Sequence, residues 1–168
     1  MPILIPQTPT PSLPPLLQRI RACALCAPHL PCGPRPVLQA ARSARVLVVG
    51  QAPGRRVHET GIPFNDPSGE RLRSWMGLER AAFYDESLVA LLPHVQLTLV
   101  IGQYALAWHL PQHRGTLTEA VRANPYRDGA LWVLPHPSPR NNRWLAQNPW
   151  FEAEMLLGLR TRIRSAQD

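Results

Sequence analysis

The chain has 168 residues. This length suits one ordinary domain that buries roughly two thirds of its unfolded surface, and it excludes a disulfide-stapled miniprotein. Its 18 cationic side chains outnumber 11 carboxylates for a net charge of +7, and every cationic one is arginine. Without lysine, side-chain Schiff-base chemistry and the phosphate-binding lysine of P-loop NTPases are excluded. The basic balance favours a polyanionic partner, since arginine pairs bidentately with phosphate and stacks on bases.

Hydropathy and the N-terminal sequence bear on location. The longest apolar runs, such as residues 46–49 and 97–101, span about five residues, far fewer than the roughly 20 that cross a bilayer. No basic stretch followed by an apolar segment and a small-residue cleavage site marks a secretory signal. We therefore expect a monomeric protein in the cytoplasm without a membrane partner.

Prolines dominate the first part of the chain. Half of the 20 prolines precede residue 37, and we predict that residues 1–14 form an extended arm ahead of a single domain at residues 15–168. Leu16, Leu17 and Ile20 recur at helical spacing and predict a short helix. Cys23, Cys26 and Cys32 follow, and in a reducing compartment they are interpreted as thiols or metal ligands rather than as a disulfide framework.

From residue 45 onward, strand and helix patterns alternate. The runs RVLVVG, LTLVIG and LWVLP predict strands buried on both faces of a parallel sheet. Helices are predicted from Asp66-Pro67, over residues 103–110, and from Asn148-Pro149, where an N-cap precedes proline at the first helical position. The fold class is therefore α/β, and ligands are expected where loops leave the carboxyl ends of the strands.

Two loops carry groups capable of chemistry. Residues 50–54, GQAPG, directly follow the first predicted strand and could be a plain tight turn, but the loop continues with arginines, an aromatic ring and polar groups through GIPFNDPSG at residues 61–69. The second loop, HPSPRNN at residues 136–142, presents a histidine, a hydroxyl and an arginine on a proline-stiffened segment, which favours function over a structural hydrogen bond.

These segments resemble motifs of the uracil-DNA glycosylase superfamily. GQAPG with GIPFNDPSG is similar to the first motif of the iron-sulfur-type bacterial and archaeal branch, and HPSPRN resembles the second motif of the single-strand-selective monofunctional branch. IGQYALAWHL and the CxxC after the first helix extend the resemblance over about residues 16–160. The resemblance implies a three-layer α/β sandwich with a short, mostly parallel sheet between helices, and excision of uracil or a related deaminated base from DNA.

The resemblance also implies roles for individual residues. Gln51, Ala52 and Asn65 would border the base and the attacking water, Phe64 would stack on the flipped base, and His136 would stabilise charge on its oxygen. DNA contacts would come from Ser138 on phosphate, from Arg140 pushing into the duplex, and from Arg55 and Arg143.

The sequence departs from the family pattern in two places. Gln51 and Ala52 stand where relatives carry a carboxylate, so any general base must be His58, Glu59, Asp66 or His136, and the sequence does not choose among them. After Glu86, a stretch that in relatives brings two more cysteines is absent. Cys23 and Cys26 match the first ligand pair, but three cysteines cannot hold a four-iron four-sulfur cluster, so no cofactor is expected unless that stretch is missing only from this sequence.

Three function classes follow from these observations. The first is a monofunctional DNA glycosylase that acts on uracil or a related deaminated base. The second is a damaged-base or single-strand DNA-binding protein that has the same fold without catalysis. The third is a metal- or nucleotide-binding protein outside repair, which would rest on the CxxC and the glycine-rich loop alone.

Overall fold

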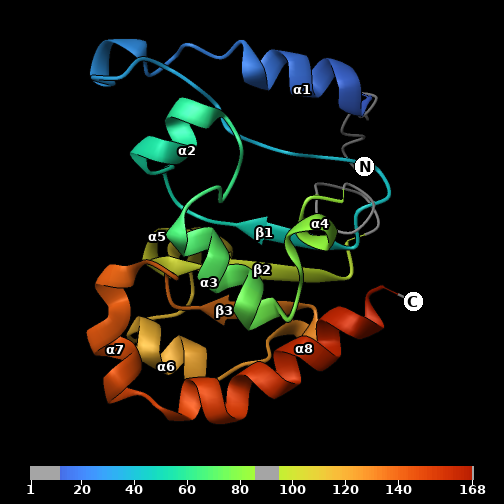
Figure 1. Ribbon diagram of the computed structural model, residues 1–168, viewed down its shortest axis with the longest axis vertical. Helices are drawn as coiled ribbons and strands as arrows, with labels where there is room; N and C mark the ends of the chain where they lie inside the picture. Colours follow the sequence, from blue (N-terminus) through green and yellow to red (C-terminus); the bar gives the residue numbers. More distant parts are fainter. Residues whose placement is uncertain (1–11, 86–94, 168) are drawn as a thin grey trace, which may run out of the picture. The chain divides into compact units, whose positions relative to one another are not determined.

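A computed structural model describes residues 12–85 and 95–167 (Figure 1). The chain divides into two compact units, residues 1–36 and 37–168. In the first unit, α1 (Leu13–Arg21) is followed by a single 3₁₀ turn, η1 (Ala27–His29). The helix predicted around Leu16 and Leu17 is confirmed, and it begins at Leu13 because Pro14 and Pro15 are accepted in a first helical turn. The remainder of the predicted extended arm, residues 1–11, lies outside the described residues.

A three-stranded parallel sheet forms the centre of the second unit. The strands are β1 (Val46–Val49), β2 (Leu97–Ile101) and β3 (Leu131–Leu134), in the order β1-β2-β3, and they match the three predicted runs. Val46 pairs with Leu97, and Thr98 pairs with Leu131. Because all three strands run the same way, their carboxyl ends meet at one edge of the sheet, where α2 (Arg55–Thr60) and α7 (Asn142–Gln147) also lie in Figure 1.

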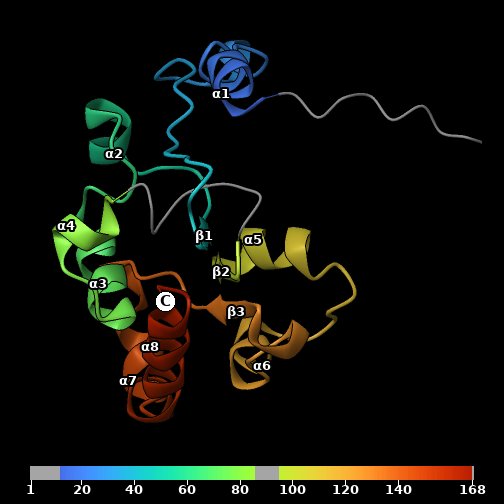
Figure 2. The same ribbon diagram turned by 90° about the vertical axis from the view of Figure 1, so that its right-hand side faces the viewer.

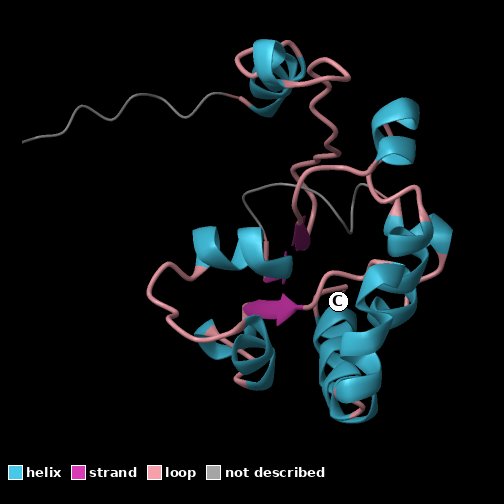
Figure 3. Ribbon diagram, turned by 90° about the vertical axis from the view of Figure 1, so that its left-hand side faces the viewer, coloured by secondary structure: helices cyan, strands magenta, loops and turns pink. Residues whose placement is uncertain are grey.

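Helices cover both faces of this sheet, so the fold is α/β as predicted. Figures 2 and 3 show α5 (Gly102–His109) and α6 (Leu117–Arg122) on one face of the sheet. They show α3 (Pro67–Met76), α7 and α8 (Leu156–Ser165) on the other face. The helices are α2 (Arg55–Thr60), α3 (Pro67–Met76), α4 (Arg80–Phe83), α5 (Gly102–His109), α6 (Leu117–Arg122), α7 (Asn142–Gln147) and α8 (Leu156–Ser165). The short turns are η2 (Arg127–Gly129), η3 (Pro139–Asn141) and the π-helical η4 (Phe151–Met155).

The start of α3 follows directly from its sequence. Asp66 is the N-cap, and its side chain accepts a hydrogen bond from the Gly69 amide at 2.9 Å, with proline as the first helical residue. Leu72, Trp75 and Met76 are buried as their spacing predicts. The Trp75 ring contacts Phe151 edge to face at 4.9 Å between ring centroids, which joins α3 to the C-terminal helical segment.

One local prediction was wrong. Residues 55–60, expected to continue the loop after GQAPG, form the helix α2 between Gly54 and Gly61. Its C-cap, Gly61, has a φ of 70°, a left-handed conformation that glycine adopts without strain. The helix brings Arg55 and Glu59, four residues apart, onto the same face, and the Arg55 Nε to Glu59 Oε1 distance is 2.8 Å.

No helix within the described residues is long and apolar enough to cross a membrane.

Candidate active site

A cavity of about 440 Å³ opens at the carboxyl edge of the sheet. Its walls come from the two loops that the sequence singled out. They are residues 51–54, Val57, Phe64, Asp66, Ser68, His136, Ser138, Arg140 and Asn141. The cavity therefore holds six of the predicted site residues: Gln51, Ala52, Phe64, His136, Ser138 and Arg140.

Glycines at the ends of the first two strands allow this convergence. Gly102 follows β2 with a φ of 81°, and a Cβ atom placed on it would lie 3.6 Å from the His136 Cβ and 3.9 Å from Gln51 Oε1. The side chains of Gln51 and His136 thus approach the same point above β2. Gly50 follows β1 and allows a close approach instead, since a Cβ atom there would lie 3.3 Å from the tip of the Phe64 ring.

Hydrogen bonds define the state of the His136 ring. The Ser138 backbone amide donates to His136 Nδ1 at 3.2 Å, so Nδ1 acts as an acceptor and the ring proton belongs on Nε2. Burial lowers the pKa of His136 below its ordinary value, while the negative charge of Asp66 opposes that effect. The imidazole is therefore neutral near pH 7 with Nε2–H as its available donor.

The loop that carries His136 is held at several points. The Asn141 side-chain amide donates to the His136 carbonyl at 2.7 Å. Arg71, on α3, donates to the Ser138 carbonyl at 3.0 Å and to Asn142 Oδ1 at 2.7 Å. The Ser138 hydroxyl oxygen accepts from the Arg140 amide at 3.2 Å, as the N-cap of η3. These bonds fix the second loop against α3, so the position of His136 does not depend on its own chain neighbours alone.

Three side chains that the sequence did not single out hold the loop at residues 63–65. The Tyr84 hydroxyl donates to the Pro63 carbonyl at 2.8 Å, and Arg73 donates to the Phe64 carbonyl at 3.3 Å. Arg80 donates to Asn65 Oδ1 at 2.9 Å. We call Arg73, Arg80 and Tyr84 the loop clamp.

The clamp residues also stack on one another. The Arg73 guanidinium, only 6% exposed, lies 5.5 Å from the Phe83 ring centroid and 5.8 Å from that of Tyr84, and Arg80 lies 5.1 Å from the Tyr84 ring. The clamp holds Phe64 at a φ of 53°, a left-handed conformation that costs free energy for a non-glycine residue.

Phe64 lies between a polar and an apolar region. Besides the cavity above, it lines a second cavity of about 260 Å³, whose walls include Leu47 and Val49 of β1 together with Val37. Its ring also contacts Phe83 edge to face at 6.2 Å between centroids. Apolar contacts on one side suit an aromatic residue that offers a stacking surface to a planar ligand on the other.

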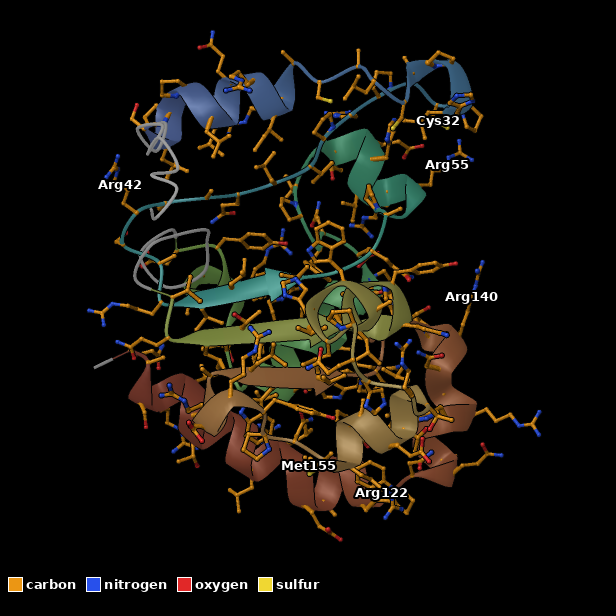
Figure 4. The ribbon with its side chains drawn as sticks, turned by 180° about the vertical axis from the view of Figure 1, so that it is seen from behind. Cys32, Arg42, Arg55, Arg122, Arg140 and Met155 are labelled. Carbon is orange, nitrogen blue, oxygen red and sulfur yellow. The ribbon has the colours of Figure 1, made fainter. Side chains whose placement is uncertain are left out.

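The remaining predicted residues lie outside the cavity. Asn65 lines neither cavity and its side chain is bound to Arg80. Arg55 pairs with Glu59 on α2, and Arg143 is exposed on α7. Figure 4 shows Arg55 and Arg140 on the side toward which the strands point, with the Arg140 side chain extending away from the ribbon.

The cysteines do not fit an iron-sulfur cluster. Cys23 and Cys26 are exposed after α1, and the 168 residues hold three cysteines where such a cluster takes four thiolates. Across residues 12–85 and 95–167, no three or more His, Cys, Asp and Glu side chains are grouped to hold a metal ion.

In open α/β proteins, ligands bind outside the carboxyl ends of the strands, and this polar cavity, lined by a neutral histidine and an aromatic ring, lies at that edge of the sheet. The family model of the uracil DNA glycosylase superfamily matches the chain in two stretches, residues 38–98 and 88–160. The chain belongs to the uracil DNA glycosylase superfamily. Membership supports a DNA glycosylase type of function, with DNA as the substrate.

Proposed function

We propose that the protein is a monofunctional DNA glycosylase, which hydrolyses the N-glycosidic bond of uracil or a related deaminated base. The observation that carries this proposal is the neutral His136, whose ring lines the same cavity as Gln51 and Phe64 while its Nδ1 is occupied by the Ser138 amide. A uracil that leaves as an anion needs a hydrogen-bond donor at its oxygen more than it needs a covalent nucleophile.

The cavity residues divide the work of binding and bond cleavage. Phe64 offers its ring to the flipped base, and Gln51 borders the base and the water. His136 donates through Nε2 to the developing oxyanion, where one donor is commonly worth 10²- to 10³-fold in rate. The Ser138 hydroxyl can donate to a phosphate while its oxygen accepts from the Arg140 amide. With no lysine in the sequence, a side-chain Schiff base and the lyase step that it permits are excluded.

A second candidate function rests on Gln51 and Ala52. Because neither side chain can act as a base, a protein of this fold could bind damaged or single-stranded DNA without cleaving it. That protein would use the same cavity and the same arginines.

Incubation with a uracil-containing oligonucleotide, followed by alkaline cleavage of abasic sites, separates the two candidates. Oligonucleotides with cytosine or thymine in place of uracil are the matched controls. We expect strand cleavage with uracil alone. Binding to the uracil oligonucleotide without cleavage would contradict the excision of uracil and favour the binding protein.

A further inference from the structure

Asp66 is the acidic group of the cavity. Among the residues that the structure describes, it is the one carboxylate in the cavity walls, where His136 and Arg140 are the other titratable side chains. Glu59 does not line the cavity, and its carboxylate is paired with Arg55 at 2.8 Å. His58 does not line it either. Of the four general-base candidates in the sequence, Asp66 and His136 line the cavity. His136 carries its proton on Nε2 and accepts the Ser138 amide on Nδ1, which leaves Asp66 as the candidate base.

The two oxygens of Asp66 have different surroundings. Oδ1 accepts the Gly69 amide at 2.9 Å as the N-cap of α3, so the orientation of the carboxylate is fixed. Oδ2 faces the glycine-rich loop after β1, since a Cβ atom placed on Gly54 would lie 3.6 Å from it. Gly54 and Asp66 line the same cavity, so Oδ2 lies beside the loop that borders it.

The charge of Asp66 also reaches His136. It raises the pKa of the imidazole against the larger, opposite effect of burial. Asp66 and His136 line the same cavity, so the carboxylate lies near the place where the base would leave. The same negative charge would stabilise the positive charge that develops on the deoxyribose as the bond breaks.

We infer that Asp66 is the general base of the hydrolysis, an inference that rests on the proposed function. The N-glycosidic bond breaks and its electron pair leaves with the base, which His136 stabilises as an anion. The water oxygen bonds to the sugar C1′ and gives one proton to Asp66 Oδ2 while Oδ1 stays on the Gly69 amide. Asp66 then returns that proton to solvent, and the base anion takes one up, so one water is consumed per base released.

The Asp66→Asn variant tests this assignment without removing the helix cap, because an asparagine oxygen can still accept the Gly69 amide. Single-turnover excision from a single-stranded uracil oligonucleotide should fall about 10²-fold or more, with affinity for that oligonucleotide changed only a few-fold. Glu70→Gln, which removes an exposed carboxylate from the same helical turn, should excise at the unmodified rate. An unchanged rate in Asp66→Asn would overturn the assignment.

A second variant asks whether a carboxylate elsewhere in the cavity can replace Asp66. Gln51 lines the same cavity, so Gln51→Glu combined with Asp66→Asn should recover part of the lost rate, whereas a purely structural role for Asp66 predicts no recovery.

NMR titration of His136 adds a readout that needs no turnover. Asp66→Asn should lower the pKa of His136, and an unchanged pKa would show that the carboxylate does not act in the cavity. Failure of the wild-type protein to excise any base would instead overturn the proposed function, and the general-base role with it.

Discussion

The protonation state of His136 follows from three contacts of one ring. Burial disfavours the imidazolium, the Ser138 amide occupies Nδ1, and Asp66 partly offsets the burial. A second proton on Nδ1 would point at the Ser138 N–H and remove the hydrogen bond that orders the loop. The pH dependence of stability should therefore report on the same contact that prepares Nε2 as a donor.

Stability should fall as the pH is lowered through about 6.5, the ordinary pKa of histidine. The folded-state pKa of His136 is lowered, so the unfolded chain binds the proton more readily, and the contribution of this residue is fully present only above about pH 6.5. His136→Asn keeps an acceptor for the Ser138 amide but does not titrate. Its Tm should change less between pH 7 and pH 5 than that of the wild type. Part of the pH dependence should remain, because burial and Arg127 lower the pKa of His109 as well. Parallel Tm profiles for the two proteins would contradict this explanation.

Arg140 and Arg143 make a matched pair of exposed cations. Arg140 lines the cavity, whereas Arg143 lies on α7 outside it. If Arg140 fills the gap left by a flipped nucleotide, Arg140→Ala should slow excision from duplex DNA more than from a single strand, because only the duplex must also lose base pairing, at a cost of a few kcal/mol. Arg143→Ala should affect both substrates by a similar small factor. Equal losses on both substrates for Arg140→Ala would show that it does not act in base opening.

At the scale of elements, the loop clamp connects α3 and α4 to the first motif. Arg73 of α3, Arg80 of α4 and Tyr84 just after α4 each bind a different residue of the segment 63–65. Gly69 contributes to the same packing, because a Cβ atom there would overlap the Phe64 carbonyl oxygen. The conformation of Phe64 therefore depends on three side chains that do not themselves line the cavity of His136.

Removing one clamp contact should affect both stability and excision. Arg73→Met keeps the apolar stem but leaves the Phe64 carbonyl without its donor and removes the cation over two rings, for a destabilisation of about 2–4 kcal/mol. Tyr84→Phe loses a single hydroxyl hydrogen bond and should cost only about 1 kcal/mol. Urea unfolding measures both costs. Excision should be slower in Arg73→Met even at temperatures where the variant is fully folded, and an unchanged rate there would separate the clamp from the positioning of Phe64.

Element prediction from sequence succeeded where local signals and burial agree. The three strands are continuous apolar runs that end at glycine or proline, and α3 has an aspartate cap followed by proline, so each could be recognised from its own residues. The helix α2 could not, because RRVHET is six residues long and its N-cap, Gly54, makes no side-chain capping bond. Tertiary contacts decide so short a segment more than its propensity does.

The site was predictable to the same degree and for a related reason. Parallel strands bring their carboxyl ends together, so two polar loops after β1 and β3 are expected to meet, and Gln51, Phe64 and His136 do lie around one cavity. The buried Arg73 could not be foreseen, because arginine is seldom buried and its partners are a backbone carbonyl and two rings. Nor could the sequence show that Arg55 pairs with Glu59.

At the scale of the whole molecule, the net charge of +7 predicts how DNA binding responds to salt. Each phosphate neutralised on a single strand should contribute about −0.7 to the slope of log affinity against log salt concentration. Fluorescence anisotropy between 50 and 200 mM salt measures this slope, and Arg140→Ala should reduce its magnitude by about 0.7 if that residue contacts one phosphate. Affinity that does not change with salt would argue against a nucleic-acid partner.

Single-turnover excision of uracil by the wild-type protein and by His136→Ala tests the central claim most directly. If His136 donates to the departing base, the wild type should release uracil from a single-stranded oligonucleotide, and the variant should be slower by about two orders of magnitude while binding that oligonucleotide within a few-fold of the wild-type affinity. Excision by His136→Ala at the wild-type rate would contradict the role of the neutral imidazole, and no excision by either protein would contradict the glycosylase itself.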